Sequence, residues 1–71
     1  MNLFAKKVLE YQQKKLVEAE NNLKLHLTKK QQLKEITNSD KEIANEEKMI
    51  KIWSANIEKI KYEINKIREK K

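Results

Sequence analysis

The stretch IWSANIEKIKYEINKI, residues 52–67, decides the fold because its isoleucines recur at a strict helical spacing. Alternating steps of three and four residues mark positions a and d of the coiled-coil heptad, whose positions are labelled a to g. The same frame extends back to Ile43, and Glu46 is its one polar member. The pattern predicts a long helix with an apolar seam that faces another helix. The seam positions are Ile43, Glu46, Ile50, Trp53, Ile57, Ile60, Ile64 and Ile67.

The first half of the chain carries a weaker copy of this pattern, shifted by one residue relative to the second frame. One residue of slip turns the apolar stripe by about 100° around a straight helix, so one helix serves both frames poorly. The slip lies between Thr37 and Glu42, where Ser39 and Glu42 form a capping-box pattern and Asn38 suits a helix end. We expect helices over about 3–36 and 40–69 with a turn at 37–39; the alternative is one long helix with a stutter. The first seam comprises Ala5, Leu9, Gln12, Leu16, Ala19, Leu23, His26, Lys30 and Leu33.

Composition favours the same architecture. The chain has 71 residues, of which 39% are charged, and it contains no glycine, proline or cysteine. Sheet-rich folds need frequent turns that glycine and proline usually supply, whereas long helices do without both. We therefore predict an all-α fold in which residues 1–71 form a single domain.

Two helices of near-equal length with a short connection should fold back as an antiparallel coiled-coil hairpin. Centring the turn on Asn38 sets Leu23 opposite Trp53 and Lys30 opposite Glu46. The second pair brings together opposite charges from the two seams. We interpret it as a buried ion pair that fixes the register of the hairpin, because a slipped pairing would leave a charge unmatched.

The apolar seam is thin for a chain of this length, and apolar residues outside it gather on one side. They occupy positions c and g of both helices, and the two g edges of an antiparallel pair lie on the same side. We predict that this side packs against a partner protein or a second copy, giving a helical bundle. The apolar band consists of Phe4, Val8, Tyr11, Leu25, Ile36, Met49 and Ile52.

The sequence offers no catalytic constellation. His26 is the one histidine, and it falls within the first seam, so we read it as structural. We find no metal-ligand spacing, phosphate loop or activated serine, and we expect a non-enzyme without cofactor, metal or small-molecule substrate.

The chain carries a net charge of +6, and basic residues concentrate near its two ends. Such a cluster fits a nucleic acid or an anionic membrane surface, but it also fits an ordinary solvated surface in a lysine-rich chain. The candidate contacts to an anionic partner are Lys6, Lys7, Lys66, Arg68, Lys70 and Lys71.

These observations predict a small protein–protein interaction module that acts as an adaptor, co-chaperone or inhibitor through its apolar helical face. Two alternatives stay open, a basic hairpin that binds nucleic acid and a structural or scaffolding coiled coil. No stretch is apolar enough for a transmembrane segment or a signal peptide, and the lack of cysteine fits a cytoplasmic protein.

Overall fold

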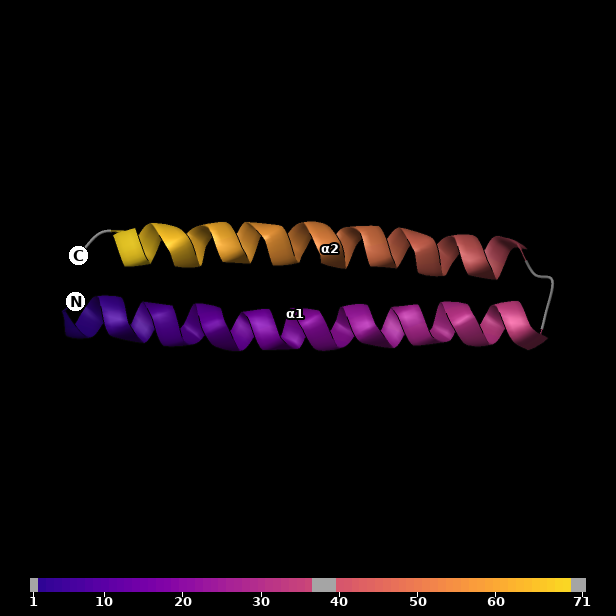
Figure 1. The fold of residues 1–71 in the computed structure, drawn as a ribbon, viewed down its shortest axis with the longest axis horizontal. Coiled ribbons are helices and arrows are strands. Elements are labelled where there is room, and N and C mark those ends of the chain that lie inside the picture. The colour runs from indigo at the N-terminus through magenta and orange to yellow at the C-terminus, as the bar shows by residue number, and fades with distance from the viewer. Residues whose placement is uncertain (1, 37–39, 70–71) are drawn as a thin grey trace.

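Two helices lie side by side along almost their whole length in the computed structural model, which describes residues 2–36 and 40–69 (Figure 1). Helix α1 runs over Leu3–Ile36 and helix α2 over Asp40–Glu69. The start of α1 and the end of α2 lie at the same end of the molecule, so the helices are antiparallel. The predicted all-α hairpin and both helix ranges are confirmed. The predicted turn at 37–39, including Asn38 and Ser39, lies outside the described residues.

The helix ends carry the groups that their unpaired backbone requires. The side-chain oxygen Oδ1 of Asn2 accepts a hydrogen bond from the backbone N–H of Ala5 at 2.7 Å, which caps the start of α1. Acidic Asp40 lies in the first turn of α2, and Arg68 lies in its last. Both charges oppose the helix dipole favourably, so each end of α2 is stabilised electrostatically.

The seam predicted from the heptad pattern faces inward in both helices. Every predicted seam position from Ala5 to Leu33 and from Ile43 to Ile67 is buried or half-buried. The structure therefore uses the isoleucines of α2 for internal packing. Among the described residues the buried core consists of Ala19, Ile57, Ile60 and Ile64, and the half-buried Leu9, Leu16, Leu23 and Trp53 pack against it.

This core occupies only part of the hairpin. No residue in the described ranges 24–36 and 40–56, which form the half nearer the turn, is buried. The shape of the molecule agrees with this, because the Cα trace extends 53 Å along its longest axis and only 14 and 11 Å along the other two. A rod this slender has little interior, so most of each helix remains at the surface.

Candidate functional surface

The apolar band predicted from the sequence lies largely at the surface. Phe4 is 78% exposed, Tyr11 60%, Leu25 48% and Ile52 45%. Ile36 is also exposed, while Val8 and Met49 are half-buried. Large apolar side chains at this exposure gain little from the hairpin itself. The described part of the hairpin therefore leaves these side chains largely without packing contacts.

Some exposed apolar residues lie outside the band, and they provide natural comparisons for it. Tyr62 is 62% exposed on the outer face of α2, which nearly matches Tyr11. The two rings even share a local contact, because Lys15 Nζ lies 5.5 Å from the Tyr11 ring centre and Lys66 Nζ lies 5.5 Å from that of Tyr62. Tyr11 and Tyr62 thus differ mainly in the side of the hairpin on which they stand. The exposed apolar residues outside the band are Leu3, Val17, Leu27 and Tyr62.

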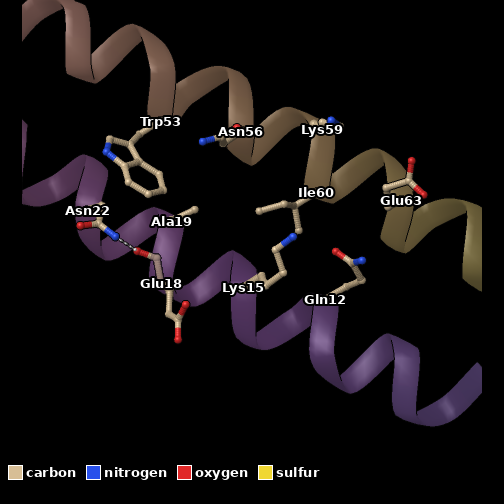
Figure 2. A pocket seen from close by; sticks show the side chains of 10 residues that line it. All are labelled: Gln12, Lys15, Glu18, Ala19, Asn22, Trp53, Asn56, Lys59, Ile60 and Glu63. Atoms are coloured by element: carbon tan, nitrogen blue, oxygen red, sulfur yellow. Dashed lines mark hydrogen bonds between the residues drawn. The ribbon is translucent and has the colours of Figure 1, made fainter.

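A hollow of about 440 Å³ opens between the helices on the g side (Figure 2). Its apolar lining comes from the core residues Ala19 and Ile60 and from the half-buried Trp53. The remaining lining residues are polar or charged and come from both helices. They are Gln12, Lys15, Glu18 and Asn22 of α1, and Asn56, Lys59 and Glu63 of α2.

The charges around this hollow are not paired within the hairpin. Within residues 2–36 and 40–69, the ionic contacts shorter than 4 Å involve Glu46 and Glu47 and none of the hollow's residues. In Figure 2 the Glu18 carboxylate points away from α2 and the Glu63 carboxylate points away from α1. The rim of the hollow therefore offers two cations and two anions to the surroundings.

The ion pair predicted between Lys30 and Glu46 is wrong. Glu46 instead contacts His26, whose Nδ1 lies 3.1 Å from each carboxylate oxygen of Glu46. Lys30 Nζ contacts Glu47 Oε2 at 3.4 Å, in a more exposed position. Lys30 and Glu46 thus both lie in the seam as predicted, but each contacts a residue other than the predicted one.

The reason for this exchange is solvation. The side chains of His26 and Glu46 are only 14% and 13% exposed, whereas those of Lys30 and Glu47 are 27% and 55% exposed. A lysine stem is long enough to carry its ammonium group out of the seam, and burial of that charge is costly. The compact imidazole stays inside the seam and contacts the half-buried carboxylate. The predicted register placed Lys30 opposite Glu46, and it could not show that His26, one turn away along the seam, takes the contact instead.

Trp53 carries a second feature that the heptad pattern does not predict. Its indole Nε1 is buried and has no hydrogen-bond partner among the described residues. An unpaired N–H of this kind costs stability, while the rings of the indole pack against the core. Trp53 is therefore held in the seam by its apolar surface alone.

Four of the six basic residues predicted to meet an anionic partner belong to the described part of the chain. Lys6, Lys7, Lys66 and Arg68 are all exposed. They belong to the start of α1 and the end of α2, which Figure 1 shows at one end of the rod. Lys70 and Lys71 lie outside the described residues.

Other kinds of site were sought in the same part of the chain. The described residues contain no group of three or more His, Asp or Glu side chains that would hold a metal ion. Neither α1 nor α2 has the length of apolar sequence that a membrane crossing requires.

Comparison with protein-family models, with curated proteins and with solved structures finds no match to this chain. Its surface must therefore be interpreted from its own residues.

Proposed function

We propose that this protein is a non-enzymatic interaction module, of the adaptor, co-chaperone or inhibitor class, that buries its apolar band on a partner. The observation that carries the proposal is the contrast between the band and the core. Five of the seven band residues are 45–80% exposed, while the core of the described chain contains only four buried residues. Exposed apolar side chains that gather on one side of a small protein are typical of an interaction site.

Phe4 and Tyr11 are the best candidates for the centre of this contact. They lie two helical turns apart on α1, and half-buried Val8 lies between them. Aromatic side chains contribute the largest share of binding energy in many protein interfaces. Two exposed rings at this spacing fit the groove-binding mode of an amphipathic helix.

The test compares two tyrosines in affinity purification from the native host. Tyr11→Asp should abolish retention of a specific partner, whereas Tyr62→Asp should leave it unchanged. Tyr62 is the matched control, because its ring has nearly the same exposure and the same lysine contact but lies outside the band. Phe4→Asp should repeat the effect of Tyr11→Asp. Equal retention by all three variants would refute the band as the binding surface.

A second candidate function is binding to nucleic acid through the basic end of the rod. It is supported by the shared location of the exposed Lys6, Lys7, Lys66 and Arg68. Binding by phosphate contacts should fall steeply as salt increases, and it should weaken uniformly across sequences on replacement of Lys6 and Lys7 by glutamine. Absence of any retention on DNA and RNA columns at low salt would rule this function out.

A further inference from the structure

The g side of the hairpin carries a short row of polar residues on each helix, and the charges in the two rows have opposite signs. Along the rod, the residues of α1 around the hollow follow in the order Asn22, Glu18, Lys15. Those of α2 follow, in the same direction along the rod, in the order Asn56, Lys59, Glu63 (Figure 2). In the register that sets Leu23 opposite Trp53, Glu18 lies within one residue of the level of Lys59. Lys15 and Asn22 lie within two residues of the levels of Glu63 and Asn56, so groups of matching chemistry lie near one another along the rod.

These level pairs are not contacts within the hairpin. The ionic contacts of the described chain lie elsewhere, at Glu46 and Glu47. The side chains of Glu18 and Lys59 occupy outward c positions on opposite edges of the side, and both are exposed. Their complementarity therefore needs another molecule to be used.

We infer that a second copy of this chain packs g side against g side, with a two-fold axis along the rod, to form an antiparallel four-helix bundle. Rotation about that axis moves no residue along the rod, and it sets α1 of one copy on α2 of the other. Each residue of α1 then faces the residue of the second α2 at its own level. Glu18 meets Lys59 and Lys15 meets Glu63, and the symmetry makes each contact twice.

Because this rotation cannot shift one copy along the rod, the hairpin's own register determines which residues of the two copies face each other. One turn towards the hairpin's other end, the same operation sets Leu25 against Ile52, both exposed in the isolated hairpin. The alternative two-fold axis, across the rod, lays α2 on its own copy. The outward c positions of α2 include both Lys59 and Lys66, and an axis midway between them would bring these two cations together.

The size of the surface agrees with a stable dimer. A side 53 Å long and 14 Å wide offers on the order of 700 Å² per copy, close to the ~800 Å² per partner of a standard interface. All neighbouring helices in the bundle run antiparallel, which is the ordinary arrangement of a four-helix bundle. The inference rests on the proposed interaction function, because it names one partner for the same side of the hairpin.

The first experiment is sedimentation equilibrium of charge variants at low salt. We expect the wild-type chain to dimerise, and Glu18→Lys to raise the dissociation constant by roughly tenfold, since two ion pairs become two repulsive contacts. The double variant Glu18→Lys with Lys59→Glu should restore wild-type affinity. Glu10→Lys makes the same charge change at an exposed outer position and should have no effect.

A wild-type chain that stays monomeric at every concentration would overturn the inference, as would equal effects of Glu18→Lys and Glu10→Lys. Circular dichroism of each variant checks that the helices persist. If Glu18→Lys does not fold, the second experiment still decides the question.

That experiment uses the absence of native cysteine. Mixing an Asn22→Cys variant with an Asn56→Cys variant under mild oxidation should give a disulfide-linked pair, because these positions face each other across the two-fold axis. Each variant alone should stay unlinked. Linking of either variant to itself, without the mixed pair, would overturn this arrangement.

The outcomes also separate this inference from the proposed function. A monomer whose partner is lost only on Tyr11→Asp would refute the dimer and support the interaction module. A dimer that responds to Glu18→Lys, with no partner lost on Tyr11→Asp, would support the inference and refute a band that binds a different protein.

Discussion

The seam layer of His26 and Glu46 allows a quantitative test of how the two helices are held together. Replacing Glu46 by leucine removes the acceptor that lies 3.1 Å from His26 Nδ1 through either oxygen. Replacing His26 by leucine instead leaves the carboxylate without its donor. Each single variant therefore sets one polar group against an apolar side chain in a layer where both side chains are less than 15% exposed.

The expected magnitude follows from burial and geometry. A polar group left unpaired in a buried site costs about 1–3 kcal/mol, and we take the lower end because some exposure to water remains. For a domain of this size, about 1 kcal/mol corresponds to a shift of ~4–8 °C in the melting temperature. The double variant His26→Leu with Glu46→Leu creates an apolar layer, and it should be at least as stable as the wild-type chain.

Thermal unfolding followed by circular dichroism measures these changes. All chains must be compared at one concentration, because dimerisation raises the apparent stability. A non-additive cycle for the pair of His26 and Glu46 is the expected result. The matched cycle of Lys30→Leu with Glu46→Leu should show the smaller coupling, since Lys30 contacts Glu47. A larger coupling between Lys30 and Glu46 would refute this account and restore the ion pair predicted from the sequence.

Three further predictions concern the stability of the hairpin. Asn2→Ala should lower the free energy of unfolding by about 0.5–2 kcal/mol in a urea titration, because it removes the cap on the Ala5 N–H. Ile57→Ala should cost about 2–5 kcal/mol in the same titration, whereas Ile52→Ala, at an exposed position, should cost far less at concentrations below dimer formation. Amide hydrogen exchange should be slowest around the buried core of α2 and faster in the range 40–50, where no residue is buried.

The sequence predicted the backbone of this protein well for a physical reason. The position of a helix and the side it turns inward depend on many residues acting together, as the isoleucines of α2 do. A single polar residue at a seam position, such as Glu46, does not change which side of the helix turns inward. The heptad frames therefore located both helices and every seam residue that the structure describes.

Choices made by single side chains were not predictable in the same way. The partner of Glu46 depends on whether an imidazole or an ammonium group bears burial better, and on how far each stem reaches. Spacing gives the level of a residue along the rod, but not the direction of its terminal atoms. The hollow on the g side was missed for a related reason: it depends on the short side chains of Ala19, Asn22 and Asn56 lying together, which neither helix pattern shows alone.

The dimer covers most of the side that carries the band, including Leu25 and Ile52, but it leaves Phe4 uncovered. In the bundle, α1 of one copy is covered by α2 of the other, and α2 ends at Glu69. Phe4 lies at the start of α1, beyond the level that this end of α2 reaches, and it is the most exposed aromatic residue described. Because the two-fold axis runs along the rod, both copies of Phe4 stand at the same end of the bundle. Self-association would therefore bring two exposed Phe4 side chains to one end of the bundle, and a partner that contacts both would gain affinity without any new kind of contact.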